Sequence, residues 1–244
     1  MFIGLGTLIN VLAITIGASL GVYAGGKLTK STRSLITDVL GLITLLSAAS
    51  ALLPMWGSRY VDALPKGWPL LAILASLLIG GVVGSALNIE ARLDGFGDYL
   101  RRKFGAHEQS TFLEGFVSSS LLFVIGPLAI LGSISDGMTN GIDQLVLKSS
   151  LDFFAAMAFA ASLGWGVAAS AIPVGIYQGV WTVIGYWLGS VLTGYQIDAM
   201  TIVGGLMLAS IALRLLKIRE IPIGNLMPAL VIAPIFVTAL NYFV

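Results

Sequence analysis

One acidic residue, Asp152, stands in a stretch that is otherwise almost entirely apolar or small, KSSLDFFAAMAFAASLG at 148–164. A carboxylate in such a stretch is costly unless it faces a cavity or a partner, and acids placed in this way commonly mark an ion or proton pathway. We therefore expect Asp152 to be a functional acid, either ionised and paired or neutral. The structural alternative is that Asp152 pairs with Lys148, one helical turn earlier, or caps a neighbouring helix.

A second polar group lies in TFLEGFVSSSLLFVIGPLAILGS at 111–133. Three consecutive hydroxyls, Ser118, Ser119 and Ser120, could hydrogen-bond across a helix interface or help to coordinate a dehydrated cation. Gly126 and Pro127 follow near the centre of this stretch and are expected to break or kink the helix. Irregular backbone at such a depth is tolerated only where it is buried or lines a cavity.

Glu114 opens the same stretch and has two interpretations. Thr111 and Glu114 have the spacing of a capping box, in which the threonine begins the helix and the glutamate bonds back to it. Alternatively, Glu114 belongs to the polar site. We retain it as a candidate binding residue.

The composition places these residues in a membrane. The chain has 244 residues, of which 57% are hydrophobic and only 10% are charged, against about 25% charged in a soluble domain. The absence of cysteine excludes disulfides, and the single histidine, His107, argues against a histidine-built metal site. No basic aromatic patch indicates nucleic acid, no cofactor is expected, and without an HExxH motif or a base for a serine nucleophile we expect no enzyme.

Hydropathy predicts an all-α polytopic membrane protein that forms a single transmembrane domain over 1–244. A spanning helix needs about 20 mostly apolar residues. Eight stretches qualify: 2–24, 34–54, 68–89, 111–133, 145–163, 171–193, 198–217 and 223–243. Seven spans stay open, because LGWG and Pro173 interrupt the fifth and sixth.

The basic residues favour eight spans, with both chain ends outside the cytoplasm. In this arrangement ten Lys and Arg residues fall on the inner side, and only Arg59, Lys66 and Lys148 on the outer side, as the positive-inside rule requires. Seven spans would place the basic cluster at 214–219 outside. We read the N-terminus as a retained helix rather than a signal peptide.

The longest polar segment, 88–110, is expected to be a cytoplasmic amphipathic helix on the membrane surface. Leu93, Phe96, Tyr99 and Phe104 recur at near-helical spacing. Gly95 weakens this prediction, and an ordinary solvated loop is the alternative.

A weak internal similarity predicts an inverted repeat of spans 1–3 and 6–8 around spans 4 and 5. IGASLG at 16–21 resembles IGYWLG at 184–189, and two further segment pairs follow at nearly the same offset. A shift of five helices inverts the second copy, which is a common build for secondary transporters. At this offset Asn10 corresponds to Gln178, so two amides could line a polar path near the midplane.

Small-residue pairs at GxxxG spacing predict close helix packing. They also permit a homodimer. The pairs are Gly17/Gly21, Gly80/Gly84 and Gly185/Gly189.

The central sequence resembles a known family. EGFVSSSLLFVIGPLAILGSISDG, KSSLDFFAAMAFAASLGWGV and SAIPVGIYQG resemble the signature of a bacterial inner-membrane family catalogued as domain of unknown function 554, and GTLINVLAITIGASLG and NLMPALVIAPI resemble its ends. The resemblance covers nearly the whole chain and implies an inner-membrane location. It places Glu114, Asp136, Lys148, Asp152 and Gln178 on motif positions, whereas Pro127 and Phe153–Phe154 depart from the pattern. It implies no activity.

These features favour a transporter or permease for a small solute or ion, coupled to a cation or proton through Asp152. With one buried acid and no buried base, the sequence favours a cationic or zwitterionic substrate. The expected binding residues are Asp152, Ser118, Ser119, Ser120, Gln178, Asn10 and Glu114. A channel-like pore and a scaffold or sensor that binds a partner through 88–110 are the alternatives.

Overall fold

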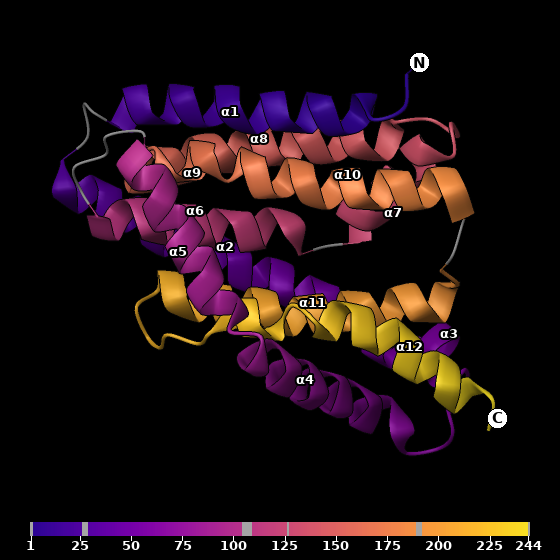
Figure 1. Ribbon diagram of the computed structural model, residues 1–244. Helices are drawn as coiled ribbons and strands as arrows, with labels where there is room; N and C mark the ends of the chain where they lie inside the picture. The colour runs from indigo at the N-terminus through magenta and orange to yellow at the C-terminus, as the bar shows by residue number, and fades with distance from the viewer. Residues whose placement is uncertain (1, 26–28, 104–108, 126, 189–191, 244) are drawn as a thin grey trace. The chain divides into compact units, whose positions relative to one another are not determined.

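The protein is all-helical in the residues that the computed structural model describes, which are 2–25, 29–103, 109–125, 127–188 and 192–243. The apolar segments form helices because, in lipid, a helix satisfies its own backbone hydrogen bonds. The helices are α1 (Leu5–Gly25), α2 (Lys30–Leu52), η1 (Leu53–Trp56), α3 (Ser58–Val61), α4 (Trp68–Ala86), α5 (Ile89–Lys103), α6 (Gln109–Val124), α7 (Pro127–Gly137), α8 (Asp143–Leu163), α9 (Gly166–Ala169), α10 (Ala171–Leu188), α11 (Gly194–Leu215), η2 (Ile223–Leu226) and α12 (Ala229–Asn241) (Figure 1).

Within the described ranges, seven helical segments are long and apolar enough to cross a membrane, and an eighth is formed if a bent pair counts as one span. The bent pair is Thr111–Val124 with Leu128–Gly137, whose axes differ by 62°. A break was predicted here at Gly126 and Pro127; Gly126 itself lies outside the described residues. The fold class is therefore as expected. The number of candidate spans is seven, or eight if this bent pair is counted as one span.

One local prediction about a helix end was wrong. Helix α6 begins at Gln109, so Thr111 lies inside the helix and is not its N-cap. The predicted break between the fifth and sixth spans is present, because α8 ends at Leu163 and Pro173 lies in the first turn of α10, where a missing N–H costs no helical bond. The segment 88–110 does contain a helix, α5, and its position on the membrane surface stays a prediction. Three residues used in the sequence predictions, Lys27, Phe104 and His107, lie outside the described residues.

The chain divides into two compact units. The first contains residues 1–40 and 93–191, and the second contains residues 41–92 and 192–244. Each unit joins segments that are far apart in the sequence. The single domain over 1–244 stays a prediction.

The first unit is organised around α8, against which α1 packs along most of its length (Figure 1). Gly17, Gly21 and Gly25 occupy successive turns of α1 and lie against the backbone of α8 at Phe153, Met157 and Ala161. A Cβ atom at any of the three would collide with a backbone carbonyl of α8. The predicted role of the first small-residue pair in close packing is therefore confirmed.

Helices α10, α7, α6 and α9 complete the first unit. Helix α10 packs against α7 and α1, and α6 packs against α8 and α9. Gly185 lies against the backbone of Ile134, and Gly137 against that of Thr182, so α7 and α10 also meet through glycines. Gly189, the second member of that predicted pair, lies outside the described residues.

The second unit packs α12 and η2 against α4 and α11. Gly80 and Gly84 of α4 lie against Ala229 and Asn225, which confirms the second predicted glycine contact. The side-chain oxygen of Asn225 accepts a hydrogen bond from the N–H of Glu90 at 2.9 Å and so caps the beginning of α5.

Candidate functional site

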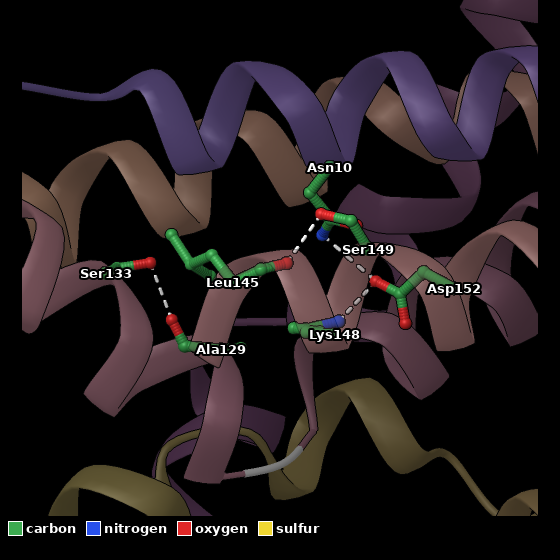
Figure 2. Close-up of polar contacts among 7 residues, drawn as sticks. All are labelled: Asn10, Ala129, Ser133, Leu145, Lys148, Ser149 and Asp152. Atoms are coloured by element: carbon green, nitrogen blue, oxygen red, sulfur yellow. Dashed lines mark hydrogen bonds and ion pairs between the residues drawn. The ribbon is translucent and has the colours of Figure 1, made fainter. Parts of the chain in front are cut away.

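Asp152 is the tenth of the 21 residues of α8 and so lies near the middle of this candidate span. Its Oδ2 atom forms an ion pair with Nζ of Lys148, one helical turn earlier, and accepts a hydrogen bond from Nδ2 of Asn10 at 3.0 Å (Figure 2). The side chains of Lys148 and Asp152 are only 8% and 10% exposed. The pairing with Lys148, which was the structural alternative to a functional role for Asp152, is therefore present, and both side chains are buried.

Lys148 corrects one expectation from the sequence. It lies in the second turn of α8 and is buried. Its ammonium group also stands 5.9 Å from the centre of the Phe123 ring, within the range of a cation–π contact. The argument that the site has one buried acid and no buried base was therefore wrong: the site contains one of each.

Asn10 and Gln178 are brought to the same level of two antiparallel helices. A Cβ placed on Gly175 of α10 would lie 3.0 Å from Val11 of α1. One turn away along α1 and two turns away along α10, the hydroxyls of Thr7 and Thr182 are 3.5 Å apart. Gln178 lies between the two α10 positions, as Asn10 lies between the two α1 positions. Both amides are fully buried.

The spacing along α6 places one of the three candidate serines on the side of this helix that faces α8. Gly115 faces Leu163 of α8, and the Phe123 ring faces the ammonium group of Lys148. Ser119 lies midway between Gly115 and Phe123, and residues four apart share one face of a helix. Ser119 therefore lies on the side of α6 that faces α8.

Ser118 and Ser120 point away from the direction of Ser119, since successive helical residues are rotated by about 100°. Both are nonetheless buried, because α6 is also covered by α9 and α10. The sequence grouped the three serines as one step, whereas the helix distributes them over three sides.

Six side-chain atoms in this region are buried without a hydrogen-bond partner among the described residues. They are Oδ1 of Asn10, the hydroxyls of Ser118, Ser119 and Ser120, and both Nε2 and Oε1 of Gln178. All of them belong to residues that the sequence proposed for binding. An unpartnered buried polar group costs about 1–3 kcal/mol, so its presence calls for an explanation.

Other buried hydroxyls of the protein behave differently. Ser76, Ser133, Ser149 and Thr182 each donate to the carbonyl of the residue four positions earlier in their own helix. The bonds of Ser133 to Ala129 and of Ser149 to Leu145 are drawn in Figure 2. Buried hydroxyls satisfied by their own helix are therefore common here, and Ser118–Ser120 depart from that pattern.

Glu114 is half-buried in α6, on the turn before Ser118. Asp136, which the resemblance placed on a motif position, is buried at the end of α7 and accepts hydrogen bonds from the N–H groups of Gly4 and Gly6, at 3.2 and 3.0 Å. Its charge therefore lies at the N-terminus of α1, where a helix dipole favours an anion. Asp136 has a structural role that its sequence context, an apparent Asp–Gly turn, concealed.

A further buried acid was missed altogether. Asp198 of α11, in the second unit, is buried and makes a two-pronged ion pair with Arg59, whose Nε donates at 2.6 Å. Hydrogen bonding to Asp198 and its negative charge raise the pKa of Arg59. Burial, reinforced by the charge of Asp198, raises the pKa of the neighbouring Tyr60. The only sequence signal was an acid in the first turns of an apolar helix.

No group of three or more His, Asp or Glu side chains that could hold a metal occurs in the described part of the chain. The first unit buries one ion pair, two amides and three serine hydroxyls at the positions that the sequence singled out. These groups can donate and accept hydrogen bonds.

Comparison with known proteins identifies the family. Residues 5–238 match the family described as Protein of unknown function (DUF554). The chain belongs to this family. It is 28% identical over 239 residues to the uncharacterized membrane protein YdfK of Bacillus subtilis (strain 168), with 98% of this chain and 97% of the relative covered. It is 30% identical over 236 residues to the uncharacterized protein YqgA of Escherichia coli (strain K12), with 94% of each covered. No solved structure matches.

Family membership and the apolar helices agree that this is a multi-pass membrane protein. The family description supplies no activity, so a functional argument must come from the site itself.

Proposed function

We propose that this protein is a transporter for a small polar solute, located in the bacterial cytoplasmic membrane with both chain ends outside. The observation that supports transport is a buried ion pair together with six unpartnered, buried polar atoms in the same unit, at mid-helix positions of candidate spans. Hydrocarbon supplies no partner for such groups, so a polar path used by a solute accounts for their placement.

The ion pair provides a coupling element. Protonation of Asp152 would remove the negative charge that holds Lys148 and would leave Asn10 as a donor to a neutral acid. A proton at this one atom would therefore change the charge and the hydrogen bonding on α1 and α8 together.

The predicted inverted repeat would give this site a mechanism. Under that repeat α1 corresponds to α10, and these helices run antiparallel with Asn10 and Gln178 at one level. A site at such a crossing could be opened to either side of the membrane by rocking of the two copies. The bent pair of helices α6 and α7 lies in the same unit and would supply one wall of the site.

The first experiment is a screen for solutes that raise the melting temperature of the detergent-purified protein, followed by uptake of the best solute into proteoliposomes. Asp152→Asn and Ser119→Ala are expected to lose the stabilisation. Ser133→Ala is the matched control, because Ser133 is a buried serine of the same unit that is satisfied by its own helix.

The result separates the alternatives. Saturable uptake that fails in Asp152→Asn supports the transporter, whereas flux that rises linearly with solute concentration would favour a channel. If no solute binds and Asp152→Asn is only less stable, the transport proposal is wrong. Loss of cellular function on disruption of 88–110 would then favour a scaffold or sensor. In each of these proposals, whether transporter, channel, or scaffold or sensor, the protein is not an enzyme.

A further inference from the structure

We infer that the solute accepted by this site carries no net charge and both donates and accepts hydrogen bonds. The inference rests on the proposed transport function and concerns the chemical class of the substrate. From the sequence alone a cationic or a zwitterionic solute was favoured; this inference keeps the zwitterionic solute and excludes the cationic one.

The first step is the charge of the site. The carboxylate of Asp152 is matched by Lys148, and both side chains are at least nine-tenths buried (Figure 2). The buried Asp136 of the same unit is held by two backbone N–H groups at the end of α1. The pair at the site therefore sums to zero before a solute arrives.

The second step is the cost of adding a charge. An ion placed beside an intact neutral pair in a low-dielectric interior leaves one charge without a partner, and this costs several kcal/mol. A cation could bind Asp152 only by displacing the ammonium of Lys148, which would then be the unpaired buried charge. A neutral or zwitterionic solute avoids this cost.

The third step is the kind of hydrogen bond that the unpartnered atoms of the site can form. Oδ1 of Asn10 and Oε1 of Gln178 can only accept, Nε2 of Gln178 can only donate, and the hydroxyl of Ser119 can do either. A solute with a single kind of group would leave some of these atoms unsatisfied. Amides, polyols and the zwitterionic amino acids satisfy both kinds.

The test compares small solutes of similar size and different charge on the purified full-length protein. Urea, acetamide, glycerol and glycine represent the uncharged and zwitterionic class, methylammonium and Na⁺ represent cations, and acetate represents anions. We expect stabilisation and binding by members of the first class only. Gln178→Leu and Ser119→Ala should each weaken that binding by about tenfold, the weight of one or two hydrogen bonds.

A second variant makes the charge argument directly testable. Lys148→Met leaves Asp152 without its cation, so this variant should gain at least about tenfold in affinity for methylammonium or Na⁺ relative to the native protein. Lys148→Met combined with Asp152→Asn is the control, and it should lose the gained cation binding. If Lys148→Met does not fold, the question is decided by comparing binding of the same solutes to the native protein and to Gln178→Leu.

The outcomes distinguish the two proposals. If methylammonium or Na⁺ binds the native protein in an Asp152-dependent manner and the uncharged solutes do not, the charge inference is overturned while transport stands. If no member of any class binds and Ser119→Ala only stabilises the protein, water alone meets these groups, and both proposals fail.

Discussion

The contact between α1 and α8 offers the sharpest test of the structure, because replacement of Gly21 by alanine adds a single methyl group against a backbone. That Cβ atom would lie 2.9 Å from the carbonyl carbon of Met157 and 3.0 Å from Cβ of Ala160, and it would also collide with the carbonyl oxygen of Met157. Ordinary contacts between carbon atoms are about 3.5–4.0 Å. Helix α1 must therefore move outward by roughly 0.5–1 Å to accept the methyl group.

The cost of this movement exceeds the gain from alanine. A gap of roughly 0.5–1 Å forfeits a quarter to a half of the dispersion energy along the seam, and overpacking of a tight interior costs about 1–3 kcal/mol. Alanine gains at most about 1 kcal/mol over glycine in helix propensity. We expect Gly21→Ala to lower the free energy of unfolding by up to about 2 kcal/mol, the difference between these two effects.

The matched control is Gly179→Ala in α10. This position is also a helical glycine of the first unit, and a Cβ atom there would have nothing within 4 Å. We expect Gly179→Ala to be neutral or to stabilise by up to about 1 kcal/mol. The two variants are compared by reversible unfolding in mixed detergent micelles, followed by tryptophan fluorescence. Equal stability of the two alanine variants would refute the proposed register of α1 on α8.

Three further variants test the polar contacts. Lys148→Met should lower the free energy of unfolding by about 3–5 kcal/mol, because it leaves a buried charge unpaired. The double variant with Asp152→Asn should recover most of this loss in the same unfolding assay. Additive losses would show that the two side chains do not interact. Asp136→Asn should destabilise the start of α1 by about 1–2 kcal/mol, seen as faster hydrogen exchange of its first amides, with exchange at the C-terminal end of α1 unchanged. Tyr60→Phe should lose about 1 kcal/mol at pH 7, because the hydroxyl donates to the carbonyl of Pro69 at 3.0 Å. The pKa of Tyr60 is raised on folding, so above about pH 10 the unfolded tyrosine ionises first and the native protein should lose stability as the pH rises. Tyr60→Phe should lose less stability over the same pH range. Identical alkaline melting curves of the two proteins would contradict this reasoning.

The sequence was sufficient for the class of protein and for most of the spans. Insertion of a helix into lipid depends on the summed transfer free energies of consecutive side chains, and a short stretch of sequence is enough to estimate this sum. The same local reasoning found the glycine pairs that permit close packing and selected Asn10, Gln178 and Asp152 as unusual polar residues in apolar surroundings. Helix ends were less certain, as Thr111 shows, because polar residues near a terminus can lie on either side of it.

The partners of these residues required the tertiary structure. Asn10 and Asp152 are 142 positions apart, and their hydrogen bond depends on the register of α1 on α8. That register is set by the collision distances at Gly17, Gly21 and Gly25, which no local pattern specifies. The same kind of information distinguishes Ser119, which faces α8, from the serines on either side of it.

The sequence by itself determined that the chain is a helical membrane protein with an acid and two amides within its spans, because each residue's cost in lipid is a property of that residue and its near neighbours. Only the tertiary structure decided the charge of the site. Lys148 is close enough to Asp152 in the sequence to be its partner and also close enough to the end of α8 to extend into water. Packing of α1 and α6 around α8 buries both side chains, and burial converts an exposed lysine and an isolated acid into a neutral pair.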